Sequence, residues 1–267
     1  LNQLGVIYGR LGRANRSLWF FDQSLEILPE GMEKVKANLR RSQLLNILGR
    51  YEEAIQEINI STPTALPQAL DASRQIILGD AYWGKQDITA AEKYYEAAIV
   101  QALSSSAIYE EFLSRLSLSS MLGFQGLIAT ASEHLARAKV LISDKPDQLS
   151  YSFRDVLVSF WAKEVPIVEV QNTLFDLANN FAEIGLLQEQ GWVKLHLAEM
   201  HRKSANEKAM TDELDALQCL AITLQNNNFL AREWTLVPEL HKLAIKTHPN
   251  IAGKPPDVLE LYTMGEE

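Results

Sequence analysis

The feature that most constrains this chain is a pattern of small and large residues that recurs along its first half. In the clearest copy, the small residues Gly79, Ala91 and Ala98 alternate with the large residues Tyr82 and Tyr95. Small residues let two helices approach closely, and the tyrosine rings fill the space that remains between them. The pattern therefore predicts helical hairpins that follow one another along the chain and pack against their neighbours.

Weaker copies of this pattern lie before and after the clearest one, in residues 4–29, 45–58 and 118–138. Equivalent small residues recur at intervals slightly longer than 34 residues, which is the period of a well-known helical repeat. Short connections between helices often need positive backbone angles, which glycine adopts readily. The glycines that stand at the expected turns are Gly12, Gly49 and Gly126.

Helical periodicity continues beyond Lys145-Pro146 in longer and less regular hairpins, and a last helix is expected at about residues 228–246. Gly253 and the prolines after it end all regular structure. We therefore predict an all-α fold in which about seven hairpins stack into a right-handed superhelical solenoid over residues 1–250. A tail would follow in residues 251–267, and the first helix of each hairpin would line a concave groove.

In residue types and order, these copies resemble the tetratricopeptide repeat. The resemblance implies an array that binds another molecule on its curved surface. Repeats of this family that capture a C-terminal carboxylate carry Lys and Asn at set groove positions, whereas the first repeat here offers Asn2 and Val6. That kind of clamp is not expected in this chain.

The repeat register places several side chains on the concave side, where they would contact a peptide or a small ligand. Trp83 and Phe124 fall near the ends of first helices, so we expect surface recognition or core packing there. Two denser aromatic clusters, residues 19–21 and Phe160-Trp161, are expected in the core, with a ligand wall as the alternative. The predicted groove residues are Gln43, Asn46, Asp80, Trp83, Ser120 and Phe124.

Motifs that would indicate catalysis or a cofactor fail on spacing or on context. Residues 79–85 have the spacing of a phosphate-binding loop, but Gln86 follows where Ser or Thr should hold magnesium, and a repeat helix contains the whole stretch. His196 and His201 are five residues apart rather than the four that suit a shared metal. Adjacent acids such as Glu110-Glu111 fit solvated helix faces. We therefore expect no enzyme, no cofactor and no metal.

Composition and net charge indicate which partners and which cell compartment are expected. A net charge of −9 argues against nucleic-acid binding by this segment, because phosphate binding needs clustered Lys and Arg. No apolar run approaches the roughly 20 residues that span a bilayer, so no membrane is expected. The single Cys219 and the lack of a leader favour the cytoplasm. Since Leu1 rather than Met comes first and helical periodicity begins at once, we expect a fragment of a longer protein.

The end of the chain carries a second resemblance. Residues 257–266 look like the opening strand of a winged-helix DNA-binding domain, and the matching positions are Leu259, Leu261, Thr263, Met264 and Gly265. Residues 230–240 are similar to the closing helix of repeat domains in large bacterial transcriptional activators of the antibiotic-regulatory and LuxR-like types. The resemblance implies the sensor or interaction domain of a regulator, which binds a protein partner or a small-molecule inducer. The alternative is an adaptor that holds a helix or extended peptide of another protein.

Overall fold

The computed structural model describes residues 1–10, 12–61, 63 and 65–224, and within them it contains twelve α-helices and no strand. The helices are α1 (Asn2–Arg10), α2 (Ala14–Ile27), α3 (Met32–Ile47), α4 (Tyr51–Ser61), α5 (Gln68–Gly84), α6 (Ile88–Ser105), α7 (Ile108–Phe124), α8 (Ile128–Lys139), α9 (Lys145–Trp161), α10 (Ile167–Glu183), α11 (Leu187–Lys203) and α12 (Glu207–Leu224).

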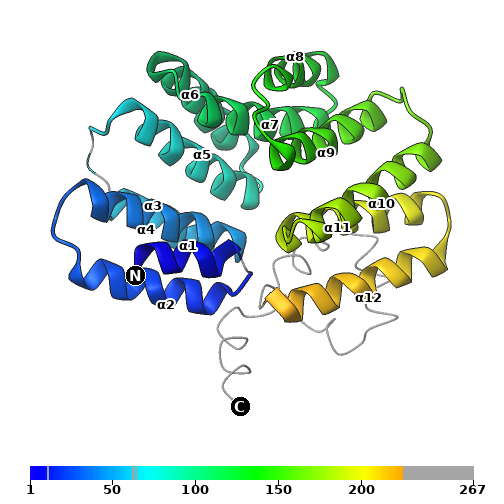
Figure 1. Cartoon of the computed structure of the whole chain (residues 1–267). Helices are drawn as coiled ribbons and strands as arrows, with labels where there is room; N and C mark the ends of the chain where they lie inside the picture. The colour runs from blue at the N-terminus through cyan, green and yellow to red at the C-terminus, as the bar shows by residue number, and fades with distance from the viewer. Residues whose placement is uncertain (11, 62, 64, 225–267) are drawn as a thin grey trace.

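Consecutive helices pair into six hairpins, each of which packs against the next. The first helices of successive hairpins, α1, α3, α5, α7 and α9, also contact one another in order. The hairpins follow an arc from α1 through α7 to α12, as Figure 1 shows. The prediction of an all-α repeat solenoid is therefore confirmed for the described residues. The expected helix at 228–246 and the tail at 251–267 lie outside them.

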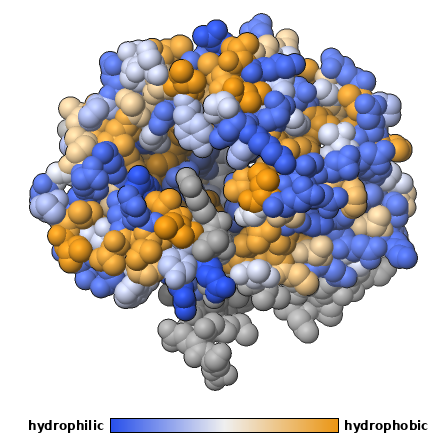
Figure 2. Space-filling view, viewed as in Figure 1, coloured by the Kyte–Doolittle hydropathy of each residue, from blue (hydrophilic) through white to orange (hydrophobic). Residues whose placement is uncertain are grey.

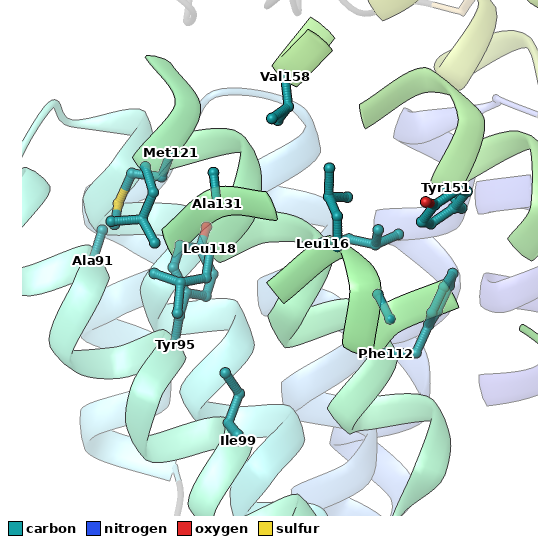
Figure 3. Close-up of a cluster of buried hydrophobic side chains, with 13 residues drawn as sticks. Ala91, Tyr95, Ile99, Phe112, Leu116, Leu118, Met121, Ala131, Tyr151 and Val158 are labelled. Carbon is teal, nitrogen blue, oxygen red and sulfur yellow. The ribbon is translucent and has the colours of Figure 1, made fainter. Parts of the chain in front are cut away.

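The core between the third, fourth and fifth hairpins shows why small and large residues alternate. Ala91 and Ala131 are fully buried, and the Tyr95 ring is 1% exposed in the same cluster (Figure 3). A Cβ atom on Gly79 would lie 2.6 Å from the Tyr95 ring, closer than side chains pack. Gly79 is therefore required for the approach of α5 and α6, as the repeat pattern predicts.

The turns within the hairpins close in a left-handed backbone conformation. Gly12, Gly49 and Gly126 have φ angles of 71°, 79° and 82°, which confirms their predicted role. Gln86 and Lys163 occupy the corresponding turns of the third and fifth hairpins, with φ angles of 65° and 61°. Neither residue is a glycine, and in both turns a backbone hydrogen bond closes the helix around it, from the Asp87 N–H to the Tyr82 carbonyl at 2.9 Å and from the Glu164 N–H to the Ser159 carbonyl at 3.0 Å.

The two ends of the described array meet. A Cβ atom on Gly12, in the turn between α1 and α2, would lie 2.0 Å from Cδ2 of Leu224 at the end of α12. Leu224 itself is 1% exposed and belongs to an apolar cluster with Leu195 and Leu217. The first and last hairpins are thus neighbours in space, as their positions in Figure 1 also show. None of the described helices combines the length and the apolar character needed to cross a bilayer.

Candidate functional site

Three aromatic side chains line up across successive hairpins. Trp83, Phe124 and Trp161 lie at the C-terminal ends of α5, α7 and α9. The Trp83 and Phe124 rings are 5.8 Å apart at 80°, and the Phe124 and Trp161 rings are 6.2 Å apart at 78°. Both contacts have the edge-to-face geometry that aromatic pairs favour. We call these three residues the aromatic row.

The two tryptophans of the aromatic row are partly buried, whereas the phenylalanine between them is exposed. Trp83 and Trp161 pack against the buried cluster of the central hairpins, whereas Phe124 between them is 47% exposed. Gly123 leaves room for Trp161, because a Cβ atom there would lie 2.7 Å from the indole ring. The row is therefore a fixed apolar surface whose middle member faces solvent.

A pocket of about 510 Å³ begins where the aromatic row ends, at Trp161. This volume falls within the range of sites that hold small ligands or the side chains of a partner. We call this pocket, which lies between the end of α9, the α9–α10 turn and the end of α11, the end pocket. Its lining residues are Phe160, Trp161, Lys163, Glu164, Val165, Pro166 and Lys203.

The α9–α10 turn gives the end pocket its shape. Lys163 closes α9 in the left-handed conformation, and its backbone N–H donates to the Phe160 carbonyl at 2.9 Å. The Glu164 N–H then donates to the Ser159 carbonyl at 3.0 Å, which satisfies a second free carbonyl of the helix. Pro166 follows just before α10 with its φ angle near −62°. These bonds hold the wall of the pocket in one conformation.

Two lysines give the end pocket a positive rim. Nζ of Lys203 lies 5.1 Å above the centre of the Phe160 ring, and 3.6 Å from Oε1 of Glu199. Arg202 binds that carboxylate more closely, with nitrogen–oxygen distances of 2.7 and 2.9 Å. Lys163 is exposed, and the part of the chain that the structure describes places no carboxylate within ion-pair distance of it.

A second polar cluster lies further along α9 and α11. The Arg154 guanidinium is 4.7 Å above the Phe153 ring, and the His196 ring meets the same phenyl edge-on at 5.4 Å. Desolvation, with Arg154 and Lys203 nearby, lowers the pKa of His196 to about 4. Desolvation also lowers the pKa of Arg154 and raises that of Glu189, although each charge partly offsets the effect on the other. The imidazole is therefore neutral near pH 7.

Of the six predicted groove residues, Trp83 and Phe124 contact each other. Asn46 is 8% exposed, and its amide donates to the Ile77 carbonyl at 2.7 Å. Asp80 accepts a hydrogen bond of 2.7 Å from the Tyr95 hydroxyl.

Ser120 donates to the Leu116 carbonyl at 3.0 Å, and Gln43 is exposed on α3. Three of the four polar residues thus make bonds within the fold, and a binding role for any of them stays a prediction.

Trp161 and the two pocket lysines were not among the predicted site residues. For Phe160-Trp161 the sequence predicts the core, with a ligand wall as the alternative; the structure packs the partly buried Trp161 against the central cluster and places it in the lining of the end pocket. Lys203 carries no local signal, because only the stacking of the fifth and sixth hairpins brings it to Phe160. The contacts Phe153–His196 and Phe160–Lys203 repeat along α9 and α11, because both members of the second pair lie seven residues after those of the first. This repetition is visible only in the fold.

The sequence motifs that would indicate a phosphate-binding loop or a metal site lie within helices of the repeat array. Residues 79–84 belong to the last turns of α5. His196 lies against Phe153, whereas Nδ1 of His201 is 3.2 Å from the Gln171 amide. Among the described residues there is no group of three or more His, Cys, Asp or Glu side chains that could hold a metal ion.

Comparison with known proteins agrees with this geometry in one segment. A family model described as a tetratricopeptide repeat matches residues 72–99, which cover most of α5 and the first two thirds of α6. Searches of curated proteins and of solved structures gave no match. The chain therefore contains a tetratricopeptide repeat in its third hairpin, and its described part is a helical repeat solenoid.

Proposed function

We propose that this chain is a non-catalytic protein-interaction module that binds a segment of a partner protein along the aromatic row and in the end pocket. The observation that carries the proposal is the continuity of these two features across three successive hairpins. Tetratricopeptide repeats suggest a protein-interaction domain, and the aromatic row gives that role a surface.

The dimensions of the row suit an extended peptide. Two centroid distances near 6 Å mean that roughly four residues, at about 3.3 Å each, would span it. Aromatic side chains that the fold already holds in place lose little conformational freedom on binding, which is why they dominate many interfaces. A partner side chain would contact Phe124 and displace the water that covers it.

The proposal is tested by selecting binders from a displayed random-peptide library with three proteins. These are the unmodified chain, the Phe124→Ala variant and a matched control, Phe175→Ala. Phe175 is 53% exposed on α10, so the control removes a similar amount of surface phenyl away from the row. Selected peptides should lose at least about tenfold in affinity, roughly 1.4 kcal/mol, with Phe124→Ala and almost none with the control. Equal effects of the two substitutions would place the binding surface elsewhere.

We further propose that the module belongs to a bacterial transcriptional regulator, where it would bind a protein partner or a small-molecule inducer. Support comes from the winged-helix pattern in residues 257–266, which lie outside the described residues. The volume of the end pocket suits an inducer as well as a peptide side chain. A stand-alone adaptor is the alternative.

The sequence that follows Glu267 in the natural protein discriminates between regulator and adaptor. A continuation with the strand–helix–helix–hairpin pattern supports the regulator, and expression of that continuation should give a domain that binds DNA in a mobility-shift assay. A natural chain that stops at Glu267 would overturn the regulator proposal and favour the adaptor.

A further inference from the structure

We infer that the end pocket selects an acidic segment, in which a carboxylate lies between Lys163 and Lys203 and a neighbouring apolar side chain enters the pocket. The inference rests on the proposed function and adds to it the chemistry of the partner. The occupant is a peptide segment in which Asp or Glu alternates with a large apolar residue.

The end pocket is lined by apolar and by positively charged side chains, which are the two kinds that such a segment would need. Phe160, Trp161, Val165 and Pro166 supply an apolar surface, and Lys163 and Lys203 supply two positive charges against the single Glu164. An apolar side chain that enters leaves its backbone at the rim, where the lysines are. A carboxylate on the adjacent residue would then be within their reach.

Among the described residues, Lys163 has no ion-pair partner, and Lys203 has one, Glu199, at the long distance of 3.6 Å. Lys203 is held over the Phe160 ring, and the acid nearest to it, Glu199, already accepts two short bonds from Arg202. Lys163 extends from an exposed turn whose backbone is fixed by hydrogen bonds. The site therefore combines one positioned and one adaptable cation, which is suited to a side-chain carboxylate on a flexible chain.

The net negative charge of the chain adds to the preference of the end pocket for an acidic segment. The chain has 34 acidic and 25 basic residues, so a basic peptide is attracted to its surface in many places. An acidic peptide is repelled by much of that negative surface and is favoured where the two lysines meet the partly buried apolar wall of the end pocket. Charge thus helps to specify the position of an acidic segment as well as its affinity.

The test uses three fluorescein-labelled decapeptides and fluorescence anisotropy. The first carries the central sequence Asp-Phe-Asp-Leu, the second carries Asn-Phe-Asn-Leu, and the third carries Asp-Ala-Asp-Ala. We expect the first to bind at least about tenfold more tightly than either of the others, and to bind more weakly as salt concentration rises. The emission of Trp161 should change on binding of the first peptide, and the Trp161→Phe variant should lose that change.

Charge reversal at the rim gives a matched pair of variants. Lys163→Glu with Lys203→Glu should weaken binding of the first peptide at least about tenfold. The control is Lys93→Glu with Lys139→Glu, which makes the same change in net charge at exposed positions on α6 and α8. Circular dichroism of both variants checks that they fold.

Each outcome bears separately on the inference and on the proposed function. Equal binding of the Asp and Asn peptides, or equal effects of the two charge reversals, would overturn the inference. If library peptides still depended on Phe124 but showed no enrichment of acidic residues, the inference would fail while the interaction module stood. If no library peptide depended on Phe124, both would fail.

Discussion

His196 shows how a single side chain on α11 is set by its neighbours on α9. Its ring packs against Phe153 at an interplanar angle of 70°, and Arg154 and Lys203 lie near enough to disfavour a further positive charge. The ring is also largely removed from water. Both effects act in the same direction, so the imidazole takes up a proton only at a pH well below that of an ordinary histidine, whose pKa is about 6.5.

The pKa of His196 predicts that acid will weaken the fold in a defined window. As pH falls below about 6.5, the unfolded chain takes up a proton that the folded chain refuses until about pH 4, so the free energy of unfolding falls. Between about pH 7 and pH 5 the loss from this residue is roughly 2 kcal/mol. Urea unfolding of the unmodified chain and of His196→Gln measures it. A variant that loses stability as steeply as the unmodified chain would contradict the prediction.

At the scale of single residues, the sequence revealed part of the candidate site. Trp83 and Phe124 could be predicted from the register, because both belong to hairpins that keep the repeat pattern. Trp161 and Lys203 could not, because the hairpins that carry them depart from that pattern. Asp80 shows a different limit, since its bond to Tyr95 depends on a packed geometry that periodicity does not describe.

At the scale of helices, polar side chains fix how neighbouring hairpins pack. Asn46 on α3 donates to the Ile77 carbonyl on α5, which joins the first helices of the second and third hairpins. Arg41, also on α3, forms ion pairs with Asp22 on α2 and Glu57 on α4, and so links three helices. Such bonds select one arrangement among several that apolar packing alone would allow.

Substitutions of Asn46 and Gln43, both on α3, distinguish a residue that stabilises the fold from one that is free to bind a partner. Asn46→Ala removes the bond to Ile77 and leaves a buried carbonyl without that donor, so we expect a loss of about 1–2 kcal/mol in unfolding free energy. Gln43→Ala changes an exposed residue and should alter stability by less than about 0.5 kcal/mol. Thermal unfolding of both variants measures the difference. Equal stabilities would mean that the Asn46 bond does not hold α3 against α5.

The helices and turns could be predicted from the sequence only where the repeat pattern is kept. The glycines at positions 12, 49 and 126 marked three turns, and alternating small and large residues marked the hairpins around them. The turns at Gln86 and Lys163 carry no such mark. Their left-handed conformation accompanies backbone hydrogen bonds that close α5 and α9, and non-glycine residues adopt it there without the residue type that would have indicated it.

At the scale of the whole molecule, the described array is more than a row of hairpins that contact only their immediate neighbours. Leu224, at the end of α12, lies against Gly12 in the first hairpin. The sequence gives no indication of this contact, because it depends on how far the arc of hairpins has turned after six units. That curvature is the sum of many small packing angles.

A pair of glycine substitutions tests the contact between the two ends. Gly12→Ala and Gly126→Ala both place a side chain in a left-handed turn, so both carry a similar backbone cost of about 1 kcal/mol. Only the alanine at position 12 would collide with Leu224, because the space beside Gly126 is open. Hydrogen exchange along α12 should therefore accelerate in Gly12→Ala and stay unchanged in Gly126→Ala. Equal exchange in the two variants would mean that the ends are independent.

The same contact changes how the first and last described hairpins would unfold. In a linear array the first and last repeats each have one unpaired side, and unfolding starts there because fraying breaks only one interface. Among the described residues, the turn of the first hairpin and the end of α12 contact each other, so fraying of either one would also break this second contact. Loss of structure in either of these two described elements would therefore remove a contact from the other.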